Sequence, residues 1–124
     1  MKTLNKQIQT WIFDLDNTLC TTQKNLYKKS KPKQKVIKLI NELHDEGYYI
    51  KIFTSRYMGR SNENVKEAKK KGFKFTTNQL KLWGVRYHYL IFGKPSYDCY
   101  VDDKSYGYKK NWHLNFKKYL KNDF

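Results

Sequence analysis

The chain has 124 residues, which allows one hydrophobic core and a single domain over 1–124, with no room for a second. No stretch approaches the roughly 20 apolar residues that a membrane helix needs, and the first ten residues lack the apolar run of a signal peptide. These features exclude an integral membrane protein and predict a soluble, cytoplasmic one. The sparse pair Cys20 and Cys99 agrees with this, since two such thiols are usually reduced in the cytoplasm.

The net charge of +15 raises the question of nucleic-acid binding. Of the 26 basic residues only three are arginine, the residue whose bidentate fork suits phosphates and base edges. An excess of lysine is more typical of compositional drift than of a nucleic-acid interface. We therefore expect the positive field to draw small anionic substrates to the protein, with specific nucleic-acid binding as the less favoured alternative.

In chain order, the first predicted elements are a strand and a polar connection. Residues 9–15 form an apolar run suited to a buried strand. Residues 21–31 are polar, and they predict a loop or a small hairpin.

A helix is predicted next, beginning at Pro32 with Ser30 or Lys31 as its cap and ending at Gly47. Its apolar residues recur at helical spacing; they are Val36, Ile37, Leu39, Ile40 and Leu43. A second buried strand is expected over 48–53.

The second half of the chain predicts shorter elements. A weakly amphipathic helix is expected from Ser61 to Gly72, and Thr76-x-x-Gln79 resembles a capping box that opens another short helix ending at Gly84. Strands are expected at 87–92 and 99–101, and the few residues between them are too short for the crossover of about a dozen residues that adjacent parallel strands require. Those two strands are therefore not expected to pair. A final amphipathic helix from Asn111 is indicated by Trp112, Phe116, Tyr119 and Leu120.

Strands that alternate with helices predict an α/β fold, a single Rossmann-like domain with a mostly parallel central sheet flanked by helices. In such sheets, ligands bind outside the carboxyl ends of the strands. Polar clusters lie at the ends of the four predicted strands or just beyond them: Asp14-Leu15-Asp16-Asn17-Thr18, Thr54-Ser55-Arg56, Gly93-Lys94-Pro95 and Asp102-Asp103.

Carboxylates that converge on one rim repel each other unless a cation neutralises them. Ligands that are all oxygen suggest Mg²⁺ rather than zinc, and the three histidines are scattered without ligand spacing. Arg56 and Arg60 are interpreted as part of an exposed charged loop, and Cys20 as a small packing residue.

The four clusters, in this order, resemble the haloacid-dehalogenase-like (HAD) superfamily, and the match covers residues 9–103. The phrase Ile-Phe-Asp-Leu-Asp-Asn-Thr-Leu carries most of the resemblance, and Asn17 departs mildly from the more usual glycine. Phe-Thr-Ser-Arg, Gly-Lys-Pro and Tyr-Val-Asp-Asp-Lys are similar to the small capless members associated with capsular or surface polysaccharide biosynthesis. The second Asp of the first motif is the mark of phosphatases within this superfamily.

The resemblance implies roles for the matching residues. Asp14 would be the nucleophile that forms an aspartyl-phosphate, and Asp16 the general acid/base. Thr54, Ser55 and Lys94 would bind the phosphoryl oxygens. Asp14, Asp16 through its backbone carbonyl, Asp102 and Asp103 would hold Mg²⁺, Asp103 either directly or through water.

Segment lengths bear on the substrate. Only a flap hairpin fits between Leu19 and Pro32, and the predicted helices and strand use up the 40 positions from Thr54 to Lys94. The site therefore lacks a cap domain, which suits a substrate too large to enclose or a homo-oligomer that covers its own sites. By resemblance, the expected substrate is a phosphorylated sugar or polysaccharide precursor.

Two alternatives stay open at this stage. One is a polynucleotide end phosphatase that uses the basic surface, and its activity would weaken with salt. The other is a non-enzymatic phospho-acceptor or binding module. The acidic pair follows the lysine here rather than the first strand, and Asp16 supplies an acid/base that such a switch lacks.

Overall fold

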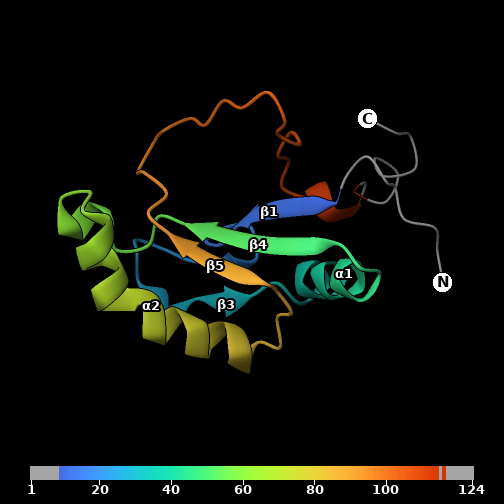
Figure 1. The fold of residues 1–124 in the computed structure, drawn as a ribbon, viewed down its shortest axis with the longest axis horizontal. Helices are drawn as coiled ribbons and strands as arrows, with labels where there is room; N and C mark the ends of the chain where they lie inside the picture. The colour runs from blue at the N-terminus through green and yellow to red at the C-terminus, as the bar shows by residue number, and fades with distance from the viewer. Residues whose placement is uncertain (1–8, 115, 117–124) are drawn as a thin grey trace.

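A computed structural model describes residues 9–114 and residue 116 of the chain. At its centre is a parallel three-stranded sheet in the order β1-β4-β5, formed by β1 (Thr10–Asp14), β4 (Tyr49–Thr54) and β5 (Tyr89–Phe92). Asp14 is in register with Phe53, and Thr54 with Phe92, so the three strands end at one edge. The described residues form one small α/β domain in which helices flank this sheet, as predicted (Figure 1).

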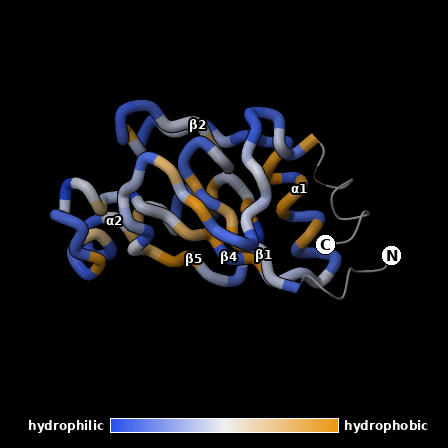
Figure 2. Tube along the Cα trace, turned by 90° about the horizontal axis from the view of Figure 1, so that it is seen from above, coloured by the Kyte–Doolittle hydropathy of each residue, from blue (hydrophilic) through white to orange (hydrophobic). Residues whose placement is uncertain are grey.

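The core lies against one face of the sheet. Along β4, Ile50, Ile52 and Thr54 are buried and alternate with half-buried residues, the period-2 pattern of a strand. Helix α1 (Gln34–Asp45) packs against β4 through the predicted apolar stripe, and all five stripe residues are buried. Seen from above, the hydrophobic positions concentrate in α1 and in the strands (Figure 2).

The start of α1 differs from the prediction. Pro32 belongs to β3 (Lys31–Pro32), which pairs antiparallel with β2 (Cys20–Thr21) and forms the predicted small hairpin. A single 3₁₀ turn, η1 (Tyr27–Lys29), lies within the hairpin's connection. Because pairing with Cys20 holds Pro32 in the extended conformation, the helix begins two residues later, after a Lys33 cap that makes no side-chain bond.

The region between β4 and β5 also differs from the prediction. A 3₁₀ turn, η2 (Gly59–Ser61), precedes one continuous helix, α2 (Val65–Leu82), which packs against β5 (Figure 1). The cap of α2 is Asn64, whose side chain accepts a hydrogen bond from the backbone N–H of Glu67. A helix end at Gly72 and a capping box at Thr76 are therefore wrong. Packing rather than a helix end explains the glycine at position 72, because a Cβ there would overlap the ring of Tyr57.

After β5 the chain arches over the β1 side of the sheet (Figure 1). The predicted strand at 99–101 is wrong, since this segment forms no ladder with any described strand and Val101 is 90% exposed. The strand predicted at 87–92 is β5, which pairs with β4 and so settles its position in the sheet.

The final predicted helix is seen in part. Residues 112–114 and 116 are helical, and Trp112 and Phe116 pack on the rings of Trp11 and Phe13 in β1. Tyr119 and Leu120 lie outside the described residues. None of the described helices combines the length and apolar character needed to cross a membrane.

Candidate active site at the carboxyl edge of the sheet

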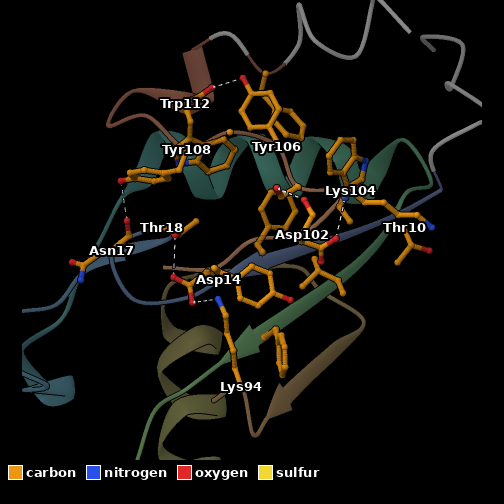
Figure 3. Close-up of a pocket in the computed structure, with 18 of the residues that line it drawn as sticks. Thr10, Asp14, Asn17, Thr18, Lys94, Asp102, Lys104, Tyr106, Tyr108 and Trp112 are labelled. Atoms are coloured by element: carbon orange, nitrogen blue, oxygen red, sulfur yellow. Dashed lines mark hydrogen bonds and ion pairs between the residues drawn. The ribbon is translucent and has the colours of Figure 1, made fainter. Parts of the chain in front are cut away.

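Asp14 is the last residue of β1 and lies at the edge where the three strands end. Lys94 Nζ is 3.2 Å from its Oδ1, and Thr18 Oγ1 donates a 3.1 Å hydrogen bond to its Oδ2 (Figure 3). Burial raises the pKa of the Asp14 carboxyl, although Lys94 and Thr18 act in the opposite direction. The site therefore holds a partly desolvated carboxylate between a cation and a hydroxyl.

Lys94 reaches this carboxylate from two residues beyond the end of β5. Its side chain is buried, and its ammonium lies near the rings of Tyr97 and Tyr100, at 4.9 and 5.2 Å from their centroids. Burial alone lowers the pKa of this ammonium, but a hydrogen bond with Tyr97 and the Asp14 charge more than offset that effect and raise it. Lys94 is therefore held as a cation beside Asp14.

Asp16 lies two residues after Asp14, in a different environment. The guanidinium of Arg56 grips its carboxylate with Nε 2.9 Å from Oδ2 and Nη2 2.9 Å from Oδ1. Thr22 donates a 2.6 Å hydrogen bond to the same Oδ1. The interpretation of Arg56 as part of an exposed loop is wrong, because Arg56 is only 1% exposed. Burial is possible since its charge is paired with Asp16.

Thr54 and Ser55 lie at the end of β4, as predicted. Thr54 is buried, however, and its hydroxyl accepts a 3.1 Å hydrogen bond from the backbone N–H of Arg56. Neither residue is among the described residues that line the hollow in front of Asp14. Thr54 thus shapes the turn that carries Arg56. Arg60, by contrast, is exposed as expected and lies over the rings of Tyr27 and Tyr57.

The comparisons with known proteins support the fold. No family model and no curated protein matches the chain. A structural-genomics target from Vibrio cholerae has a similar crystal structure. The TM-score is 0.74 at 27% sequence identity, over 90% of this chain and 99% of that one. This α/β arrangement is therefore shared with another protein over nearly its whole length.

The hollow in front of Asp14 has a volume of about 1290 Å³ and is lined by residues of β1 and of the arching chain after β5. Tyr108 fastens that chain to the first motif, because its hydroxyl donates a 3.1 Å hydrogen bond to the backbone carbonyl of Asn17 (Figure 3). Aromatic side chains line much of the hollow. They include Trp11, Tyr97, Tyr100, Tyr106, Tyr108 and Trp112.

Asp102 and Asp103 line the same hollow as Asp14 and Asp16, but from the arching chain. Asp102 is exposed, and a 3.0 Å hydrogen bond from the backbone N–H of Lys104 lowers its pKa, with Asp103 and Tyr100 adding to the effect. Within 9–114 and 116, no three Asp, Glu, His or Cys side chains are gathered closely enough to hold a metal ion. The four predicted carboxylates thus share one hollow without converging on a point.

Sequence reasoning missed the residues that surround Arg56. Its Nη1 donates to Gln79 Oε1 at 2.6 Å and lies 3.4 Å from Thr76 Oγ1, both on the buried side of α2. Two polar residues within an otherwise apolar helical face were the available signal, because buried polar groups need partners. They were instead interpreted as a helix cap.

Proposed function

We propose that this chain is a Mg²⁺-dependent phosphatase of the HAD type, which hydrolyses a phosphomonoester through an aspartyl-phosphate on Asp14. The observation that carries the proposal is the setting of Asp14 at the carboxyl edge of a parallel sheet, between Lys94 and Thr18. A carboxylate fixed in this way is a nucleophile with a cation beside it to receive the phosphoryl oxygens.

The reaction has two halves. In the first, Asp14 Oδ bonds to phosphorus as the bond from phosphorus to the leaving oxygen breaks, and Asp16 gives that oxygen a proton. In the second, a water oxygen bonds to phosphorus and gives its proton to Asp16, and the bond between Asp14 and phosphorus breaks with its electron pair returning to Asp14. Inorganic phosphate leaves, and both carboxyl groups regain their starting protonation.

The donors around the hollow fit Mg²⁺ in kind, since they are carboxylate and carbonyl oxygens. By the resemblance, Asp14, the Asp16 carbonyl, Asp102 and Asp103 would hold the ion, and to do so the acidic pair would have to move closer to Asp14 than it lies in this structure. When bound, Mg²⁺ would neutralise the charge between an anionic nucleophile and an anionic phosphate.

The aromatic lining favours a substrate whose phosphate is attached to a ring. The rings of Tyr97 and Tyr100 lie next to each other, with their centroids 4.9 and 5.2 Å from the Lys94 ammonium, and both side chains are about half exposed. Flat aromatic faces beside a phosphate-binding cation can stack against the apolar face of a sugar. We therefore propose a phosphorylated sugar as the substrate class.

The test is phosphate release from sugar phosphates, nucleotides and phosphorylated oligonucleotides, with and without Mg²⁺. We expect release that needs Mg²⁺ and falls on the order of a thousandfold or more in Asp14→Asn. Asp45→Asn is the matched control, since Asp45 pairs with Arg86 at the end of α1, away from the hollow.

Four outcomes would contradict the proposal in whole or in part. Full activity in Asp14→Asn would exclude the nucleophile, and full activity without Mg²⁺ would exclude the metal requirement. Turnover of oligonucleotides far above that of small esters would replace the sugar with a polynucleotide end. Silence across the panel from folded protein would favour a binding role.

A further inference from the structure

Arg56 is the most completely engaged charged side chain of the carboxyl edge. Each of its three guanidinium nitrogens has a partner: Nε and Nη2 contact Asp16, and Nη1 contacts Gln79. The Cζ atom of Arg56 also lies over the Tyr27 ring, 4.7 Å from its centroid. The backbone carbonyl of Tyr27 in turn accepts a 2.8 Å hydrogen bond from the Gln79 side-chain amide. Contacts other than that with Asp16 therefore also hold the guanidinium in place.

The two partners of this ion pair differ in their access to solvent. The side chain of Arg56 is fully buried, whereas 21% of the Asp16 side chain remains accessible, and Asp16 lines the hollow. The cation therefore supports the carboxylate from behind and leaves its front open towards the site of the proposed reaction. A pair that served only to fill the core would need no open side.

The two oxygens of Asp16 are also unequal. Oδ1 accepts from Thr22 at 2.6 Å and from Arg56 Nη2 at 2.9 Å, with Nε at 3.2 Å and the Cys20 thiol at 3.6 Å. Oδ2 accepts from Arg56 Nε alone among the described residues. A carboxylate oxygen has two lone pairs, so Oδ2 keeps one free for a proton.

We propose that Arg56 is a positioning residue that holds Asp16 so that Oδ2 carries the proton in both halves of the reaction. This inference rests on the proposed phosphatase function. In the first half, the proton passes from Oδ2 to the leaving oxygen as the ester bond breaks. In the second, Oδ2 takes a proton from water as the water oxygen bonds to phosphorus and the bond to Asp14 breaks.

When the leaving group is good, a misplaced Asp16 should slow the second half of the reaction more than the first. p-Nitrophenolate leaves without needing a proton, whereas water always has to lose one. Variants that misplace Asp16 should therefore still form the aspartyl-phosphate from p-nitrophenyl phosphate but hydrolyse it slowly. A residue that only stabilised the fold would slow both halves together.

The experiment compares Arg56→Lys, which keeps the charge but loses the bidentate fork, with Arg56→Gln, which loses both. We expect kcat for p-nitrophenyl phosphate to fall about 10²-fold to 10³-fold in Arg56→Gln, within the range of general acid–base effects. KM should fall with it, so that kcat/KM, which reports formation of the aspartyl-phosphate, stays nearly unchanged. Rapid mixing should show a burst of p-nitrophenol, and acid quenching should trap phosphate on Asp14. For an alkyl phosphate, kcat should fall further, and no intermediate should accumulate.

Arg60→Lys and Arg60→Gln are the matched controls, because Arg60 lies in the same segment, contacts Tyr27 and Tyr57, and does not touch Asp16. Both should retain wild-type kcat and show no burst. Circular dichroism checks that each variant folds. If Arg56→Gln does not fold, the comparison of Arg56→Lys with the wild type tests the inference.

Wild-type kcat in folded Arg56→Lys and Arg56→Gln would overturn the inference, as would a loss of kcat without trapped phospho-Asp14. Either result leaves the phosphatase proposal intact provided that Asp14→Asn is inactive. Absence of turnover in the wild type would instead overturn the phosphatase proposal and this inference with it.

Discussion

At the scale of single residues, the two aspartates of the first motif are separated by their surroundings. Asp14 meets a lysine and a threonine hydroxyl, and burial raises its pKa. Asp16 meets a buried arginine that grips both of its oxygens. Two carboxyl groups placed in different environments can take different roles in one reaction. Their order in the sequence indicated the site, whereas the arginine partner became visible only in the fold.

The raised pKa of Asp14 has a consequence for stability without metal. A carboxyl whose pKa is higher in the folded protein contributes stability below its ordinary value of 3.8, and this is lost as pH rises through the folded pKa. At pH 7 the ionised Asp14 carboxylate therefore lowers the free energy of unfolding. In EDTA, Asp14→Asn should raise the free energy of unfolding at pH 7, and the gain should shrink as the pH approaches 4.

Urea denaturation at the two pH values measures this difference. Asp45→Asn, a change at an exposed aspartate, is the control and should show no such gain at pH 7. An Asp14→Asn variant less stable than the wild type at pH 7 would mean that the Lys94 ion pair outweighs the burial of the charge.

At the scale of elements, hydrophobic periodicity predicted correctly those helices and strands whose form does not depend on contacts with distant parts of the chain. The strand at 9–15 and the apolar stripe of α1 were correct because each buries one regular face. The break predicted at Gly72 was wrong because this glycine makes room for the ring of Tyr57 and does not end a helix. The strand at 99–101 was wrong because a strand needs a partner, and the chain there crosses the hollow instead. Neither contact leaves a local pattern in the sequence.

Helix α2 offers a direct test of the Tyr57 contact. In isolation, alanine favours a helix interior over glycine by about 1 kcal/mol. In this fold, Gly72→Ala should lower the melting temperature, because the added Cβ overlaps the Tyr57 ring. In a Tyr57→Gly background, which also suits the left-handed backbone at position 57 (φ 66°), the same change should raise it.

The double-mutant cycle for Gly72 and Tyr57 gives the coupling between them. Additive effects of the two changes would show that the ring does not set the choice of glycine.

At the scale of the whole molecule, the net charge of +15 surrounds a site whose proposed substrate is an anion. Such a field raises the rate of encounter, and salt screens it over a distance of about 10 Å at 0.1 M. We expect KM for a sugar phosphate to rise a few-fold between low and physiological ionic strength while kcat stays constant. Steady-state kinetics in NaCl series measures both constants, and replacing lysines 69–71 of α2 with glutamine should flatten the rise. A KM that does not change with salt would mean that the charge plays no part in capture.

The ion pair between Asp14 and Lys94 joins positions 80 residues apart, whereas Asp16 and Arg56 are 40 apart. A ribosome makes the chain from its N-terminus, so Asp14, the proposed nucleophile, emerges long before the lysine that accompanies it. A chain stopped after β4 would carry both aspartates and the arginine, yet it would lack the cation beside Asp14. The proposed chemistry therefore depends on completed synthesis, because a nascent or truncated chain carries the proposed nucleophile in an unfinished site.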